Sequence, residues 1–341
     1  MNSQQAPKAP RVMKESKNKI RVEFERTPLL ERLKSKYLTL NFLKDVVFKI
    51  FRLVLLVGIS YVILFPFFAK ISGSFMGRDD FVDVTVKLIP KHPTLDTYSA
   101  IISSNKYFEA MFNTFTLSVL CGIIQTFICC VIGYGLAKFK FKGNKLIFFL
   151  VIFTMVIPHR TLQLSMFMHF RYFDVLGIFE LLTGEALNLN NSYWPLALLS
   201  LGGLAFKNGL YIFMMRQFFR GVPDELEESA YIDGSGVFRT FLTIILPLSV
   251  PMMITIFLFA FSWQWTDNFY TTVFFTKSKM VLMPDIIAIP KSLDTQYAAQ
   301  NLYESAIKNT CGLLILAPLL VMYVFLQRYL IGGIERSGIV G

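Results

Sequence analysis

The stretch ELEESAYIDGSGVFRTFLTIILPLSVP, residues 225–251, places a run of acids directly before a long apolar segment. Acidic side chains stabilise the positive N-terminal end of a helix, Pro223 suits a first helical turn, and Gly234 suits the left-handed residue that ends a helix. The acids are Asp224, Glu225, Glu227 and Glu228. The stretch therefore predicts a short, bounded helix, a bend at Gly234, and a second helix that leads through Pro247 into apolar sequence.

The composition around this stretch is that of a membrane protein. Hydrophobic residues make up 54% of the 341-residue chain, charged residues make up only 17%, and there are 35 Phe. No soluble core could remove so much apolar surface from water, so lipid must be part of the solvent. The cysteines lie within apolar runs and not in a spaced framework, which predicts buried thiols and neither disulfides nor a zinc site. They are Cys121, Cys129, Cys130 and Cys311.

Six largely apolar segments are long enough, some only with their flanks, to cross a hydrocarbon core of about 30 Å. They cover residues 50–69, 111–137, 146–170, 192–215, 248–275 and 310–330. The predicted fold is an all-α polytopic membrane protein with six transmembrane helices. Residues 1–45 are predicted to be a basic N-terminal extension, not a cleavable signal peptide, and residues 46–341 the transmembrane domain.

The distribution of basic residues predicts the orientation of the chain. With the N-terminus in the cytoplasm, the cytoplasmic segments carry 22 Lys and Arg, and the opposite loops carry ten. The positive-inside rule therefore favours cytoplasmic N- and C-termini. The basic extension suits anionic lipid, and it is either disordered or a docking segment.

On this topology the helix of the opening stretch lies in the cytoplasm between the fourth and fifth spans, where the bend at Gly234 makes an L. The pattern alone allows two interpretations. The helix could merely connect two spans, or it could lie against another protein. Small residues would permit the second, because Leu226, Ala230 and Gly234 recur every four residues and Ser229 and Ser235 are also small.

The stretch resembles the cytoplasmic signature of permease subunits in bacterial ATP-binding-cassette importers. That signature is Glu-Ala-Ala, then Asp-Gly-Ala, and later Ile-x-Leu-Pro, and it stands here as ESA at 228–230, DGS at 233–235 and IILP at 244–247. Two alanines are replaced by serines, which are similar in size. Further segments, among them GYGLAKFKFKGNK, FSWQWTDNF and FLQRYLIGGIERSGIVG, are similar to the maltose-type inner-membrane permeases over residues 112–341.

The resemblance implies one permease subunit of a binding-protein-dependent, ATP-driven importer for a sugar or oligosaccharide in the bacterial plasma membrane. The short helix would be a coupling helix that enters a cleft of a separate ATPase dimer, which would use the ATP and Mg, so this chain would hold no cofactor. A second homologous permease and an extracellular solute-binding protein are the other implied partners. The implied coupling residues are Glu228, Ser229, Ala230, Asp233, Gly234, Leu246 and Pro247.

The chain has few signs of chemistry of its own. It lacks the Gly-x-x-x-x-Gly-Lys-Ser/Thr loop of an ATPase, and His92, His159 and His169 do not have metal-ligand spacing. It is therefore not expected to be an enzyme, a metalloprotein or a nucleic-acid-binding protein. One alternative is an importer of the same type for a glycerol-phosphate or an anionic sugar, which Arg160 beside His159 would suit. Another is a stand-alone secondary transporter, whose expected sign is paired broken helices.

Ionisable residues at membrane depth are candidates for a substrate path. Arg160 follows Pro158 in the third span, and Asp267 lies at a similar depth in the fifth. These two could form a structural pair, contact the substrate, or lie at the interface. Lys207, in the fourth span, could extend its ammonium to the interface or face the aqueous path.

Aromatic residues around Asp267 suggest where a sugar could pack. Trp263 and Trp265 present flat faces that suit the C–H groups of a sugar ring, and Asn268 could bond to hydroxyls. A belt of aromatic residues at the outer interface is the alternative. The loop at 276–309 is expected from the resemblance to approach the solute-binding protein, and otherwise to lie on the membrane. Which sugar is carried, and whether the second permease is identical, are not determined by the sequence.

Overall fold

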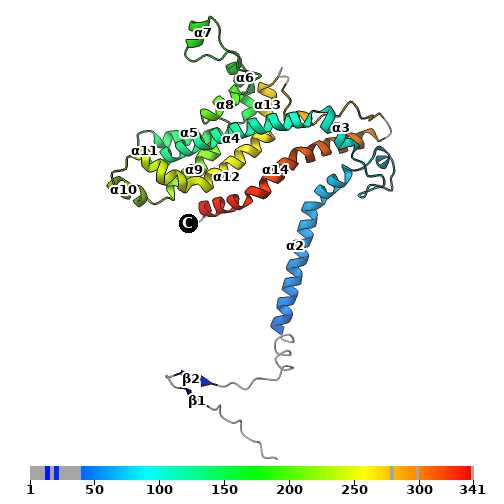
Figure 1. Ribbon diagram of the computed structural model, residues 1–341, viewed down its shortest axis with the longest axis horizontal. Coiled ribbons are helices and arrows are strands. Elements are labelled where there is room, and N and C mark those ends of the chain that lie inside the picture. Colours follow the sequence, from blue (N-terminus) through cyan, green and yellow to red (C-terminus); the bar gives the residue numbers. More distant parts are fainter. Residues whose placement is uncertain (1–11, 16–18, 23–39, 277–279, 297–298, 339–341) are drawn as a thin grey trace, which may run out of the picture. The chain divides into compact units, whose positions relative to one another are not determined.

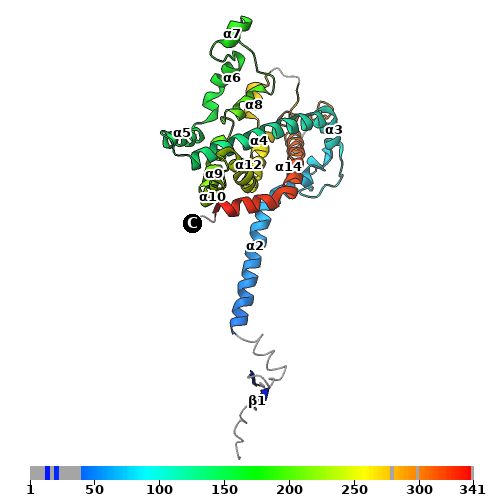
Figure 2. The same cartoon turned by 60° about the vertical axis from the view of Figure 1, so that its left-hand side comes forward.

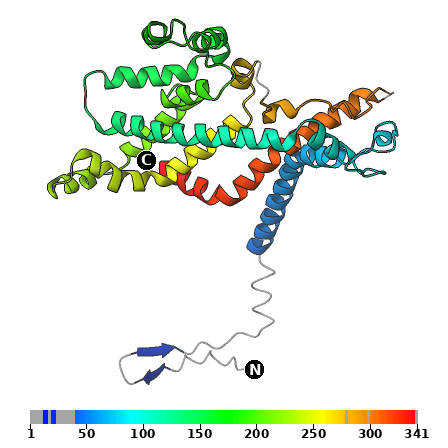
Figure 3. The ribbon, with the colours of Figure 1, turned by 45° about the horizontal axis from the view of Figure 1, so that its top comes forward.

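The structure is a computed structural model that describes residues 12–15, 19–22, 40–276, 280–296 and 299–338. Its internal contacts divide the chain into Met1–Phe68, the N-terminal unit, and Ala69–Gly341, the permease unit. In the N-terminal unit, β1 (Val12–Glu15) and β2 (Lys19–Val22) form an antiparallel hairpin with Val12 opposite Val22 (Figure 3). This hairpin is an exception to the all-α prediction, which the helices of the other described residues support. Charged and β-branched residues alternate in β2, a pattern typical of strands.

Helix α2 (Leu40–Gly73) begins in the N-terminal unit and has 34 residues. At 1.5 Å per residue it is about 50 Å long, which exceeds the hydrocarbon thickness of a bilayer. Its apolar side chains from Val47 to Phe68 are exposed, as expected for a helix whose solvent is lipid.

The permease unit is helical, with isolated β-bridges in its loops. Its elements are η1 (Arg78–Phe81), α3 (Asp96–Ser104), α4 (Tyr107–Lys138), α5 (Asn144–Val156), η2 (His159–Leu162), α6 (Gln163–Arg171), α7 (Ile178–Thr183), α8 (Trp194–Leu201), α9 (Asn208–Arg220), α10 (Glu225–Ile232), α11 (Val237–Thr240), η3 (Phe241–Ile245), α12 (Leu246–Trp265), α13 (Phe269–Phe274), η4 (Met283–Ile286) and α14 (Gln300–Gly338).

Four helices among the described residues are long and apolar enough to cross a membrane. They are Lys44–Gly73, Tyr107–Lys138, Val237–Trp265 and Gln300–Arg328. A fifth crossing exists if α5 and the helical segment His159–Arg171, which meet at 94°, count as one broken span. The chain is thus a multi-span helical membrane protein, and the count of six remains a prediction.

Two predicted spans are interrupted. The third bends after Val156, where Pro158 lacks the N–H that would continue the helical hydrogen bonds. The fourth, at residues 192–215, divides into α8 and α9, because Gly203 and Lys207 both have positive φ values, 66° and 68°. A left-handed residue cannot continue a right-handed helix.

Helix α4 is at the centre of the permease unit and packs against α8, α9 and α12 (Figures 1 and 2). Its contact with α9 is especially close, since a Cβ added to Gly133 would lie 2.5 Å from Cβ of Met215 and 3.0 Å from the backbone N of Arg216. Only glycine permits this approach. All four cysteines are free and buried in the packed interior, as predicted.

Candidate coupling site and membrane cavity

The opening stretch forms the predicted short helix, α10. Gly234 has a φ of 82°, its N–H bonds to the Tyr231 carbonyl at 3.0 Å, and the Ser235 N–H bonds to the Ala230 carbonyl at 2.9 Å. This is the left-handed C-cap that the sequence predicts. Pro223, by contrast, precedes the N-cap residue Asp224 and is outside the first turn.

After this bend the chain passes through α11 and one π-helical turn, Phe241–Ile245, into α12. The Leu246 N–H bonds to the Phe241 carbonyl, five residues back. Pro247 has no N–H for the ordinary i−4 bond, which accounts for the break in the α-helical pattern next to it. The predicted second helix through Pro247 is therefore present, with an extra residue in the turn before it.

The two faces of α10 differ in polarity and exposure. Glu228 and Ser229 are exposed, and so is Ile232, whose exposed fraction is 87%. Glu227 and Ala230 are buried, each with 6% exposed. Ala230, which sequence reasoning directed toward another protein, therefore lies against its own chain. Of the other candidate coupling residues, Asp233, Gly234 and Pro247 are exposed and Leu246 is half-buried.

Glu227 is held by two side chains from the last turns of α4. The Tyr134 hydroxyl donates to Glu227 Oε1 at 2.6 Å, and Lys138 Nζ lies 3.4 Å from Glu227 Oε2. Lys138 Nζ also donates to Asp224 Oδ1 at 2.5 Å and to the Val222 carbonyl at 2.7 Å. The Lys138 and Glu227 side chains are each only 8% exposed, so this is a buried ion pair. A buried charge is stable only when it is paired and hydrogen-bonded, as both are here.

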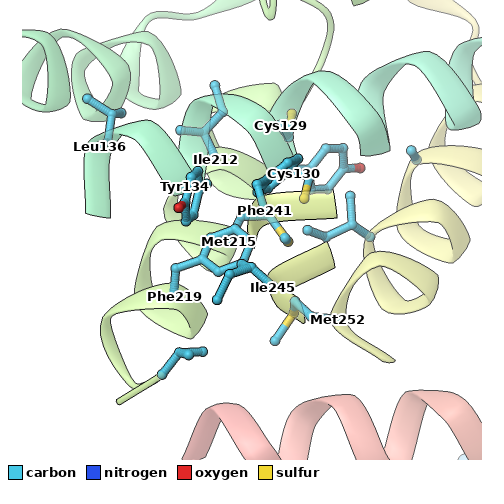
Figure 4. Close-up of a cluster of buried hydrophobic side chains, with 14 residues drawn as sticks. Cys129, Cys130, Tyr134, Leu136, Ile212, Met215, Phe219, Phe241, Ile245 and Met252 are labelled. Carbon is cyan, nitrogen blue, oxygen red and sulfur yellow. The ribbon is translucent and has the colours of Figure 1, made fainter. Parts of the chain in front are cut away.

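Tyr134, the hydroxyl partner of Glu227, belongs to a buried aromatic cluster. Its ring lies 4.7 Å from Phe241 and 5.4 Å from Phe219, measured between ring centres, and Figure 4 shows all three within one buried cluster.

Asp224 lies at the exposed edge of the network, where its hydrogen bond with Lys138, followed by the charge of Lys138, lowers the pKa of its carboxyl. Sequence reasoning used Glu227 as a helix-start acid, and it did not single out Tyr134 or Lys138. The available signal was the i, i+4 spacing of Tyr134 and Lys138 at the end of a predicted span.

A cavity of about 300 Å³ lies between the two interrupted spans. Ile157, His159 and Leu162 line it from the first break, and Gly203 and Lys207 line it from the second. Irregular backbone at membrane depth is tolerated where it is buried in protein or lines a water-filled cavity. The volume is at the lower end of that of ligand-binding pockets.

Lys207 is the cationic group of this cavity. Its Nζ lies 4.7 Å from the centre of the Phe206 ring and 5.0 Å from that of Trp263. Across the described part of the chain, no carboxylate lies within ion-pair distance of this ammonium. Nearby, the Tyr270 hydroxyl is 3.4 Å from Nδ1 of His159. Within the described residues, the two aromatic faces therefore stabilise the Lys207 ammonium in place of an ion pair.

The candidate path residues are in different environments. Trp263 and Asp267 line a smaller cavity together with Gln125, and the Gln125 side-chain oxygen has no hydrogen-bond partner among the described residues. The Asp267 carboxylate accepts the Thr271 N–H at 3.0 Å, so it caps α13. Arg160 is exposed and forms no ion pair with Asp267, so the pair considered from sequence is not formed.

Two more candidates, like Arg160, line neither cavity. Trp265 is 1% exposed, stacks on Phe261, and donates from Nε1 to the Ile315 carbonyl at 3.0 Å, so it joins α12 to α14. Asn268 is exposed at the start of α13 and accepts the Thr272 hydroxyl through its carbonyl. The proximity of these residues to Asp267 in sequence does not bring their side chains to one site.

At its other end α4 is bonded to the loop at 276–309, which was predicted to be the last external loop. The Thr114 hydroxyl accepts the Met283 N–H at 2.8 Å, and the Asn113 amide donates to the Val281 carbonyl at 3.1 Å. The loop between α2 and α3 is bonded to the same segment through an ion pair between Arg78 and Asp294 at 2.9 Å. These two loops thus pack together.

Comparisons with known proteins agree with this architecture. Residues 129–336 match the family model of the binding-protein-dependent transport system inner membrane component. Protein LplC of Bacillus subtilis (strain 168) is 29% identical over 302 residues, which cover 86% of this chain and 95% of LplC. The arabinooligosaccharides transport system permease protein AraQ of the same organism is 27% identical over 286 residues, covering 83% and 92%.

A solved structure has the same fold. It is a bacterial ABC transporter involved in the import of the acidic polysaccharide alginate, and its matching chain is 20% identical, with a TM-score of 0.60 over 84% of this chain and 97% of that chain. The family match covers more than half of the sequence and includes α10, the bend and both interrupted helices that follow α4. This chain belongs to the binding-protein-dependent transport system inner membrane components, the membrane-spanning permease subunits of ABC transporters.

Proposed function

We propose that this chain is one of two permease subunits of an ATP-driven importer that carries a sugar or oligosaccharide into the cytoplasm. The observation that carries the proposal is the polarity of α10, whose inner face is bonded to α4 and whose outer face is exposed. Because the family consists of the permease subunits of ABC transporters, we expect that outer face to contact a separate ATPase. Relatives named for galactooligosaccharides and arabinooligosaccharides support a carbohydrate and do not favour a glycerol-phosphate.

In the proposed complex, α10 enters a cleft of the ATPase and acts as the coupling helix. Glu228, Ser229 and Asp233 are exposed and polar, so they would bond to the ATPase, while Ile232 and Phe238 would be covered by it. Exposed large apolar side chains of this kind are typical of an interaction surface. Gly234 would set the angle between α10 and the helix that continues through Leu246 and Pro247.

The excess of basic residues supports a cytoplasmic location for both termini and for α10, with six spans. The external loops would then face the solute-binding protein. ATP and Mg would be bound by the ATPase dimer. The basic residues 1–45 lie largely outside the described residues and would be an extension that binds anionic lipid at the membrane surface.

The substrate path is proposed to pass the two cavities beside Trp263. Trp263 is 48% exposed and would pack on a sugar ring, while Asp267 and Lys207 would bond to hydroxyls. Arg160, which is exposed at the first break, could contribute at the edge of the path, whereas Trp265 and Asn268 would support the helices around it.

The first test is co-purification followed by transport. The tagged chain would be extracted in mild detergent, its partners identified by mass spectrometry, and the complex reconstituted in vesicles with a panel of labelled oligosaccharides and the associated binding protein. An ATPase, a second permease, and ATP-dependent uptake of a sugar are expected. Repeated isolation of this chain alone, or uptake without ATP, would contradict the proposal and favour a stand-alone transporter.

A further inference from the structure

Helix α10 follows α9 through residues 221–224, and two further connections join it to the permease unit. One is the covalent route through Gly234 and the π-helical turn into α12. Gly234 has nothing within 4 Å of a Cβ position, so this bend is not packed. The other is the buried contact of Glu227 with Tyr134 and Lys138, in which both carboxylate oxygens are bound.

The second connection leads to a helix that reaches the opposite face of the unit. Helix α4 has 32 residues and is therefore about 48 Å long. Its cytoplasmic end holds α10 through Tyr134 and Lys138, and its external end holds the last external loop through Asn113 and Thr114. Between these ends it packs closely on α9 at Gly133.

We infer that Lys138 and Tyr134 are positioning residues for coupling, which bind Glu227 so that movement of α10 passes directly to α4 and from there to the last external loop. Glu228, one residue further, is exposed and remains available to the ATPase. Glu227 thus bonds to its own chain, whereas the adjacent Glu228 remains exposed for a partner. This inference rests on the proposed function, because it assumes that α10 receives movement from an ATPase.

The physical reason is the cost of separating the pair. Moving α10 away from α4 would break the contact between a buried carboxylate and a buried ammonium, which is strongly unfavourable. Asp224 and the Val222 carbonyl add two more bonds to Lys138 just before α10 begins. The route through Gly234 contains no buried ion pair among the described residues, and its side-chain contact is a neutral hydrogen bond from Thr240 to Ser235, so bending there costs less.

The test uses the complete complex in vesicles with the loaded binding protein. Lys138→Met removes the charge but keeps the length of the side chain, and Glu227→Gln keeps an acceptor for the Tyr134 hydroxyl. Each variant is expected to lower sugar imported per ATP hydrolysed at least tenfold, while basal ATPase activity stays within twofold of wild type. Lys140→Met is the matched control, because Lys140 is exposed two residues away and has no ion pair among the described residues.

Two further variants separate positioning from simple folding. Lys138→Arg keeps the charge and should restore most of the transport per ATP. The double variant Lys138→Met with Glu227→Gln should be no worse than the worse single variant, because both act on one contact. A proportional fall in ATPase activity, transport and assembled complex would instead indicate a structural role and overturn the inference.

The outcomes also distinguish the inference from the proposed function. If the wild-type complex imports no sugar with ATP, the proposed function fails. If wild type transports normally and Lys138→Met transports as efficiently as Lys140→Met, the inference alone fails, and α10 must act through its covalent links to α9 and α12.

Discussion

The end of the permease unit that carries α10 and the two cavities near its interrupted spans contain charged and polar groups in different states of bonding. At the α10 end Lys138 is buried and bonded to three acceptors of its own chain. In the larger cavity, the Lys207 ammonium lies against the Phe206 and Trp263 rings. In the smaller cavity beside Trp263, Gln125 has an unbonded side-chain oxygen within the described part of the chain. The first region is complete within this chain, whereas the cavities have bonding capacity left for a substrate or a partner subunit.

This difference in bonding determines how each region responds to movement and to a ligand. Buried groups that are fully bonded define one geometry, and they transmit movement because separating them is costly. Groups that are stabilised only by aromatic faces can exchange those contacts for a ligand at a smaller cost. Variants that disturb the first region should therefore affect coupling, and variants in the second should affect the passage of substrate.

The largest expected effect on ATP-driven uptake is that of Gly234→Pro, at the bend that follows α10. Proline fixes φ near −65°, which excludes the observed 82°, and it removes the N–H that bonds to the Tyr231 carbonyl. ATP-driven uptake in vesicles should be lost while the chain still inserts in the membrane. Gly236→Ala is the control, since Gly236 has an ordinary φ of −79° and open space around it. Uptake at the wild-type rate in Gly234→Pro would exclude a coupling role for the bend.

Gly133→Ala tests how tightly α4 packs against α9. The new methyl group would meet the backbone of α9, which cannot rotate away, so we expect a loss of about 1 to 3 kcal/mol of stability. Thermal unfolding of the purified complex should show a fall of several degrees in Tm. Gly135→Ala, two residues along the same helix with no atom nearer than 4.0 Å, should leave Tm nearly unchanged. Equal melting of the two variants would mean that α4 and α9 are not in close contact.

Trp263→Ala tests the smaller cavity, which the Trp263 side chain lines. A stacked aromatic contact contributes about 0.5 to 1.5 kcal/mol, which corresponds to roughly a twofold to twelvefold change in rate or affinity. The uptake rate should fall within that range, while ATPase stimulation by the binding protein persists. Trp194→Ala provides the control, because Trp194 is also exposed and lines neither cavity. A parallel loss of ATPase stimulation would place Trp263 in the coupling machinery instead.

The smallest expected effect is on the stability of the ion pair between Lys91 and Asp83. This pair lies in the loop between α2 and α3, away from both α10 and the cavities. Hydrogen bonds from Lys91 and Thr85 hold the pKa of Asp83 far below its ordinary value. A lowered folded-state pKa stabilises above the unfolded-state pKa and is lost only as pH falls toward the folded-state value. Asp83→Asn should therefore lower Tm slightly at pH 7, and the difference should shrink at pH 3. A Tm difference of the same size at pH 3 and pH 7 would contradict this prediction.

Much of the fold follows from local rules in the sequence. Apolar segment length predicts the long helices, and the acids and Gly234 predict both ends of α10, because capping depends only on neighbouring residues. The fourth predicted span was wrong as a continuous helix even though Gly202 and Gly203 were visible, since apolar composition alone does not distinguish one helix from two. The hairpin in the extension was missed for a related reason, because strands of four residues give too little alternation to be recognised.

The candidate site was less predictable because it depends on packing. Glu227 and Glu228 are equivalent in sequence, and only the position of α4 decides which one is buried. Arg160 and Asp267 have opposite charges at similar predicted depth, yet Asp267 is bonded to the start of α13. Trp265 differs from Trp263 by two positions, or about 200° around a helix, and this alone directs it to α14.

The π-helical turn at Phe241–Ile245 has a consequence for evolution and engineering by insertion or deletion. Removing one residue from this turn would convert it to an ordinary α-helix with no loss of hydrogen-bonded length. Because the wide turn takes up the extra residue within about one revolution, the segment before it would keep nearly the same phase relative to α12. The outward face of α10 would then point in nearly the same direction. A deletion inside α12 itself could not be absorbed in this way and would rotate the preceding residues by about 100°. The π-helical turn is therefore the place where the chain can lose one residue with the least change in the direction of α10.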